Sequence, residues 1–299
     1  MNNDARTSLE ELNLTDRFLF AETMDEPKAY EAMVSILLED EITLAGYPQT
    51  EKELRVSPGL RAVRLDVVSI DRKGRIYFTE MQKSDTGNLI KRSRYYQAQL
   101  DVSLLEPGCS DFNRLNDSCL ILVAPFDLFG YGLYRYTFRG QCQEVPGLTM
   151  RDGADRVFIN TYGTNREDFS QEFLDFMEYI NDTREEVAAR NGGLRLQAIC
   201  DRVERVRRSE KCGVKYMQRW EEIEYARQGG FAEGISEGRM AEVICAVCRK
   251  LIKGKDVAQI AEELEKEPEE IARICRVAER YAPAYDQDAI CRELFKEVV

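Results

Sequence analysis

The sequence contains no histidine among its 299 residues. Without an imidazole, the chain cannot use Ser-His-Asp or Cys-His catalysis, and it cannot form the HExxH zinc site of metallohydrolases. Any proton transfer or metal binding must therefore rely on carboxylates, lysine, tyrosine or cysteine.

Signals for export and membrane insertion are lacking as well. No segment approaches the roughly 20 successive apolar residues of a membrane helix, and the first thirty residues do not follow the order of a signal peptide. The nine cysteines are odd in number and scattered, which fits reduced thiols better than a disulfide framework. We therefore expect a globular cytoplasmic protein, long enough for one substantial core plus an appended region.

An overall excess of basic charge is also missing, because the formal net charge is −12. Positive charge is concentrated locally: residues 51–101 contain eleven Lys or Arg against seven Asp or Glu, a net of +4, so the other residues carry −16. If the chain binds nucleic acid, the attraction must come from such a local patch.

Hydrophobic periodicity predicts a mixed α/β domain in the first 185 residues. A turn signal at 71–74 predicts a hairpin, and the order of elements up to residue 124 is α-β-β-α-β. The expected elements are one or two helices over 14–38, strands on either side of the turn, a helix at 88–105, a strand at 119–124, short strands at 133–138 and 157–162, and a helix at 167–180.

The C-terminal region from 194 to 299 is expected to be all helical, with long helices to about Arg227 and short ones from about 241. Residues 251–274 have the pattern of a helix-turn-helix, but the second helix opens with three glutamates that would repel DNA, so a protein-contact or structural role is favoured. Residues 194–219 carry eight Lys or Arg against three acids. This helix could contact a nucleic-acid backbone or form a solvated face.

Two cysteines, Cys245 and Cys248, form a CxxC pair in this region. Zinc needs four ligands, and neither a second pair nor a histidine is present. Packing between helices is therefore the favoured explanation for this pair.

Two acidic residues lie on the strands of the predicted hairpin. Asp66 is in the middle of the first strand, and Glu80 and Gln82 share one face of the second because side chains alternate along a strand. Two neighbouring strands can thus direct two carboxylates at one point. Mg²⁺ prefers oxygen ligands and keeps several waters, so Asp66, Glu80, a backbone carbonyl and a scissile phosphate would make a sufficient magnesium site, which Mn²⁺ could also occupy.

At these residues the chain resembles the PD-(D/E)XK nuclease superfamily, in its E-x-Q form. Four segments together resemble its transposase-associated, Rpn-like branch: Thr15–Phe20, Leu65–Val67, Tyr77–Gln82 and Lys91–Tyr96. The resemblance covers about residues 12–180. It implies a restriction-endonuclease-like αβββαβ core, metal binding by Asp66 and Glu80, and Gln82 at the position of the usual catalytic lysine.

The sequence departs from that pattern at two points. No proline precedes Asp66, and Gln82 lacks the positive charge of a lysine. Arg92 is the better candidate to supply that charge, because Arg92 and Tyr96 fall on one stripe of the next helix and an arginine there could clamp a phosphate. Equally, Arg92 could pair with a surface acid and Tyr96 could pack in the core. Asp16 is expected to be a helix N-cap rather than a site residue.

These observations predict a magnesium-dependent endonuclease that hydrolyses DNA with little sequence specificity and is linked to recombination or mobile elements. The alternative is a nuclease-fold module, weakly active or inactive, that binds nucleic acid or protein. DNA is the expected partner. A homodimer could place two sites on opposite strands, and the helical tail could contact protein.

Overall fold

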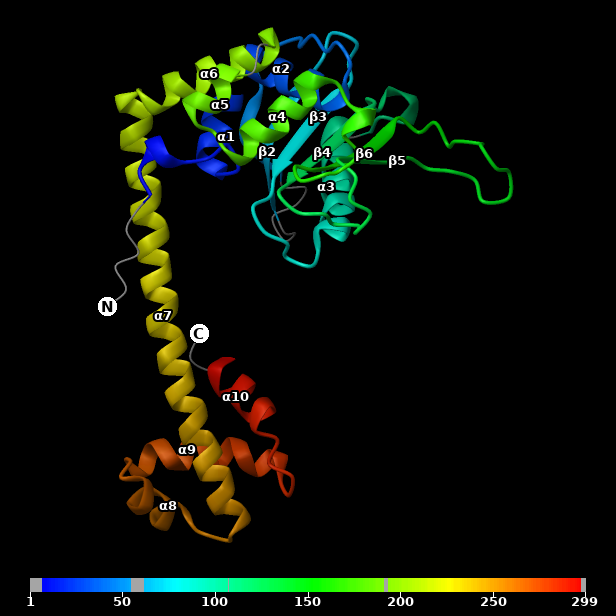
Figure 1. Cartoon of the computed structure of the whole chain (residues 1–299). Helices are drawn as coiled ribbons and strands as arrows, with labels where there is room; N and C mark the ends of the chain where they lie inside the picture. The colour runs from blue at the N-terminus through cyan, green and yellow to red at the C-terminus, as the bar shows by residue number, and fades with distance from the viewer. Residues whose placement is uncertain (1–6, 55–61, 107, 191–192, 297–299) are drawn as a thin grey trace. The chain divides into compact units, whose positions relative to one another are not determined.

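The computed structural model describes residues 7–54, 62–106, 108–190 and 193–296. Contacts between residues divide the chain into two compact units, Met1–Tyr216 and Met217–Val299. The first unit holds the sheet and the second is helical (Figure 1). Among the described residues, no helix combines the length and apolar character needed to cross a membrane.

A six-stranded mixed sheet forms the centre of the first unit. Its strand order is β1-β2-β3-β4-β6-β5, in which β3-β4 and β4-β6 are parallel and the other neighbours are antiparallel. The strands are β1 (Gln49–Leu54), β2 (Val63–Ile70), β3 (Ile76–Met81), β4 (Ser118–Ala124), β5 (Arg135–Phe138) and β6 (Ala154–Asn160). The mixed α/β class expected from the sequence is confirmed.

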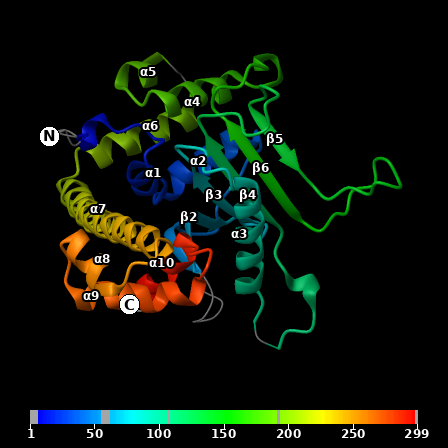
Figure 2. The same ribbon diagram turned by 90° about the horizontal axis from the view of Figure 1, so that it is seen from below.

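Helices cover both faces of this sheet. Side chains of α1, α2, α4, α5 and α6 share one hydrophobic core with alternate strand residues, and α3 forms a second core on the other face. In Figure 2, α3 lies in front of the central strands. The helices are α1 (Arg17–Met24), α2 (Pro27–Leu38), α3 (Leu89–Leu104), α4 (Gln171–Asn181), α5 (Glu185–Arg190) and α6 (Leu194–Arg207), with short 3-10 turns η1 (Leu9–Glu11), η2 (Phe112–Arg114) and η3 (Arg166–Asp168).

The hairpin between β2 and β3 is fixed by the residues that predicted it. Asp71 Oδ1 accepts hydrogen bonds from the backbone N–H groups of Lys73 and Arg75, both at 2.8 Å. Gly74 has φ +85°, a conformation that glycine adopts without a steric cost. The turn therefore sets the register that brings β2 and β3 together.

The start of α1 is also determined locally. The Asp16 side chain accepts hydrogen bonds from the backbone N–H groups of Phe18 and Leu19 at 2.8 and 3.4 Å, which confirms the expected N-cap. This cap fixes the position of Arg17 as the first residue of the helix.

Two expectations about the first unit differ from the structure. The hydrophobic pattern did not predict strand β1, because its polar sequence lacks the alternation that marks a half-buried strand; with β1 the order is α-β-β-β-α-β. Helix α6 packs against α1 and α2 and so belongs with the sheet, whereas a division between residues 185 and 194 was expected. The apolar side of α6 supplies the reason, because Leu196, Ile199 and Val203 are buried in the core of the first unit.

The second unit is built on the C-terminal part of a long helix. Helix α7 is continuous from Glu210 to Ile252, although the long helices were expected to end at about Arg227. Its end packs with the following helices in a separate core, to which Cys248 contributes a buried side chain. These helices are α8 (Val257–Leu264), α9 (Pro268–Ala278), η4 (Glu279–Tyr281) and α10 (Gln287–Lys296).

Candidate metal and nucleic-acid site

Strands β2 and β3 separate at the point where the two candidate carboxylates lie. Their antiparallel pairing extends as far as Val67 with Thr79. The next pair in the same register would be Asp66 with Glu80, but the backbone ladder does not include it. Because opposite residues of an antiparallel pair project to the same face, both carboxylates reach into the region where the strands part.

Each carboxylate replaces a backbone acceptor that the ladder no longer supplies. The N–H of Asp66 donates to Glu80 Oε1, and the N–H of Met81 donates to Asp66 Oδ2, both at 3.0 Å. Each side chain is therefore held by the backbone of the other strand, because a buried N–H requires an acceptor. The expected convergence of Asp66 and Glu80 is observed.

Both carboxylates are almost completely buried, with Asp66 2% and Glu80 5% exposed. Burial raises the pKa of both groups, and the charge of Asp66 raises the pKa of Glu80 further, to about 8. Two buried carboxylates this close favour a shared proton or a nearby cation. The pair thus has the electrostatic character of a cation site.

A cation of the protein already contacts Asp66. Arg17 Nη2 lies 2.8 Å from Asp66 Oδ1, and the guanidinium opposes the effect of burial on the Asp66 pKa. Among the described residues, however, this oxygen has no hydrogen bond of good geometry. Arg17 was not among the site residues expected from the sequence.

Gln82, the residue after β3, and Arg92, on α3, also come together. Arg92 donates through Nη2 to Gln82 Oε1, while Gln82 Nε2 donates to the carbonyl oxygen of Ser84 at 2.9 Å. The guanidinium carbon of Arg92 lies 5.6 Å from the centre of the Tyr96 ring, a cation–π distance. Arg92 therefore brings a positive charge to the side chain of Gln82.

A cleft with a volume of about 850 Å³ includes both arginines in its lining. Five of the lining residues are basic and none is acidic, and two tyrosines are added from α3. The lining consists of Arg17, Ala62, Val63, Arg64, Asn88, Lys91, Arg92, Arg94, Tyr95, Tyr96 and Ala98. Cations with interleaved aromatic rings are the groups that bind a polynucleotide backbone and its unpaired bases.

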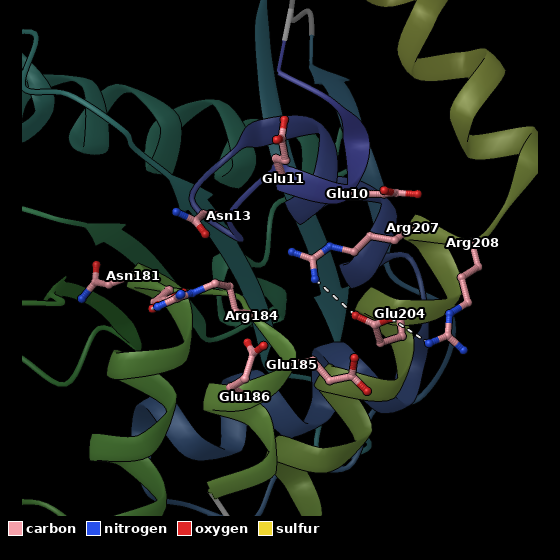
Figure 3. A pocket seen from close by; sticks show the side chains of 11 residues that line it. Glu10, Glu11, Asn13, Asn181, Arg184, Glu185, Glu186, Glu204, Arg207 and Arg208 are labelled. Carbon is pink, nitrogen blue, oxygen red and sulfur yellow. Dashed lines mark hydrogen bonds and ion pairs between the residues drawn. The ribbon is translucent and has the colours of Figure 1, made fainter.

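A second hollow of about 810 Å³ differs in charge and in the role of its arginines (Figure 3). Six of its lining residues are acidic and three are arginines. Arg207 donates to the carbonyl oxygens of Leu12 and Thr183 at 2.8 and 2.7 Å and pairs with Glu204. This arginine therefore ties α6 to two loops, and the acidic majority would repel a polyanion.

The donor set fits a magnesium ion with few protein ligands. Among the described residues, no group of three or more Cys, Asp or Glu side chains is arranged to hold a metal. Mg²⁺ often uses one or two carboxylates and completes its shell with water and phosphate oxygens. Asp66 and Glu80 supply those two carboxylates, and Arg17 Nη2, 2.8 Å from Asp66 Oδ1, occupies the position of a positive charge at the pair.

The structure adds cleft residues that the sequence did not single out. Arg17, Arg64, Lys91, Arg94 and Tyr95 all line the cleft. The local net charge of 51–101 was the sequence signal for Arg64, Lys91 and Arg94, whereas Arg17 lies outside that range and Tyr95 carries no charge. No family model, no curated protein and no solved structure matches this chain.

Proposed function

We propose that this chain is a magnesium-dependent endonuclease of the PD-(D/E)XK type, related to the Rpn-like branch, that hydrolyses DNA with little sequence specificity. The observation that carries the proposal is the pair Asp66 and Glu80, buried together where β2 and β3 part. The basic cleft supports it, because Arg17, which pairs with Asp66, and Arg92, which donates to Gln82, both line the cleft.

The residues of the chain divide into two roles in this proposal. Asp66 and Glu80 would hold the metal, which supplies a Lewis acid that activates water and neutralises charge on the phosphate. Arg92, oriented by Gln82 and Tyr96, would bind a phosphate oxygen next to the metal site. Its charge replaces that of the lysine that Gln82 does not provide.

The composition of the cleft favours backbone contacts over base recognition. Arginine and lysine side chains bind phosphates of any sequence, and aromatic rings stack on any base. A link to recombination or mobile elements follows from the resemblance of the chain to the Rpn-like branch.

Nicking of supercoiled plasmid in Mg²⁺ or Mn²⁺ tests the proposal. We expect Asp66→Asn and Glu80→Gln each to lower the rate by at least ~100-fold, because a metal contributes several kcal/mol to transition-state stabilisation. Asp85→Asn serves as the matched control, since Asp85 is an exposed acid in the loop after β3. Full activity in both carboxylate variants, or none in the parent, would remove the mechanism.

One observation favours a second candidate, a nuclease-fold module that binds nucleic acid without cutting it. Arg17 already neutralises Asp66, and Gln82 is uncharged. This candidate predicts salt-sensitive DNA binding in a chelator and no nicking with either metal. Calorimetric titration with Mn²⁺ separates the two candidates further. Only the first requires that the chain bind the metal and that Glu80→Gln lower its affinity for Mn²⁺.

A further inference from the structure

The middle of helix α7, within the second unit, presents an apolar face that the described residues leave exposed. Ile223 is 59% and Phe231 71% exposed, and Trp220 and Ile235 are also among the exposed large side chains. At 100° per residue, Trp220, Ile223, Arg227 and Phe231 fall on one side of the helix. Large apolar side chains at helical spacing on an otherwise polar helix indicate a contact with another helix.

Glycines lie on the same side between these side chains. Gly230, Gly234 and Gly238 follow one another at four-residue intervals, and a Cβ added at any of them would meet no atom within 4 Å. Glycine weakens an exposed helix relative to alanine. Its lack of a side chain allows another backbone to approach closely.

We propose that this face pairs with the same face of a second copy of the chain, in an antiparallel arrangement about a two-fold axis between Gly230 and Phe231. In this register, each large side chain of one helix lies opposite a small residue of the other. The pairs are Trp220 with Ala241, Ile223 with Gly238, Arg227 with Gly234, and Phe231 with Gly230.

The self-complementary pattern identifies the occupant as a second copy. A two-fold interface uses one patch twice, so the patch must contain both the large groups and the gaps that receive them. The segment from Trp220 to Ala241 does so over about 33 Å, or six helical turns.

Sedimentation equilibrium of the full chain at about 1 to 100 µM tests the pairing. The parent should dimerise, and Phe231→Glu and Gly234→Leu should each raise the dimer Kd at least tenfold. Leucine has a higher helix propensity than glycine, so Gly234→Leu should weaken the dimer without unfolding the helix. Circular dichroism measures the helix content of the variant. Tyr225→Glu is the matched control, since Tyr225 is 75% exposed and projects from the opposite side.

A monomeric parent overturns the proposal. So does a Tyr225→Glu effect as large as that of Phe231→Glu.

Discussion

Asp66 and Glu80 acquire their closeness from one interruption in the pairing of β2 and β3. Strand alternation predicts that the two side chains share a face, and this much follows from the sequence. The hydrogen bonds from the Asp66 and Met81 amides could not be predicted, because they exist only where the backbone ladder ends. Arg17 was missed for a similar reason, since tertiary packing alone brings the start of α1 to this site.

The raised pKa of Glu80 predicts how stability depends on pH without metal. In the folded chain this pKa is about 8, whereas the ordinary value is 4.5. Between these values the folded state binds the proton and the unfolded state does not, so this group makes the free energy of unfolding fall as pH rises. Below pH 4.5, both states bind the proton, so Glu80 no longer makes the free energy of unfolding depend on pH.

Glu80→Gln tests this linkage, because the amide cannot ionise. In urea denaturation with a chelator, the free energy of unfolding of the variant relative to the parent should rise from about pH 5 to about pH 9. Asp85→Asn, at an exposed position, should follow the parent. An identical pH dependence in Glu80→Gln and the parent would contradict the raised pKa.

Arg17→Met should change metal binding and DNA binding in opposite directions. The substitution retains an apolar stem but removes the cation 2.8 Å from Asp66 Oδ1, so the Kd for Mn²⁺ should fall several-fold at about pH 8. The cleft loses one phosphate-binding charge at the same time, so the Kd for DNA in a chelator should rise several-fold.

Arg64→Met is the matched control for this pair of effects. Arg64 also lines the cleft, but its ion-pair partner is Glu51, at 3.8 Å. The control should weaken DNA binding and leave the Mn²⁺ titration unchanged. Equal Mn²⁺ affinities in Arg17→Met and the parent would show that Arg17 does not compete with the metal.

At the scale of elements, α1 depends on its first residues to position Arg17. Asp16→Ala removes the side chain that caps two backbone N–H groups and should lower the free energy of unfolding by about 1 kcal/mol. Asp16→Ser should lose much less, because serine also caps helices well. Urea denaturation measures both, and equal losses in the two variants would argue against the cap.

The elements that the sequence predicted best are those whose burial is strongly patterned. Strand β4 is buried along its whole length, and the buried residues of α3 recur at helical spacing. The hydrophobic pattern missed strand β1 because it is a polar edge strand, paired on one side with β2 only. The long helices were expected to end at about Arg227, but α7 continues through its glycines, because glycine adopts helical angles at a modest cost and does not end a helix by itself.

At the scale of the whole molecule, a basic cleft lies in a chain with a net charge of −12. Long-range repulsion between the acidic surface and a polyanion is screened by salt, as is the attraction of the cleft. Local phosphate contacts therefore have to dominate binding. The number of these contacts can be measured from the salt dependence of the affinity.

If the five basic residues of the cleft each neutralise one phosphate, log K for duplex DNA should fall against log salt with a slope of about −4.5. Fluorescence anisotropy in a chelator measures this slope without cleavage. Arg94→Gln should reduce its magnitude by about one. Arg139→Gln should leave it unchanged, because Arg139 pairs with Asp155 and is not among the lining residues. A slope near zero in the parent, or equal reductions in both variants, would show that DNA does not bind in this cleft.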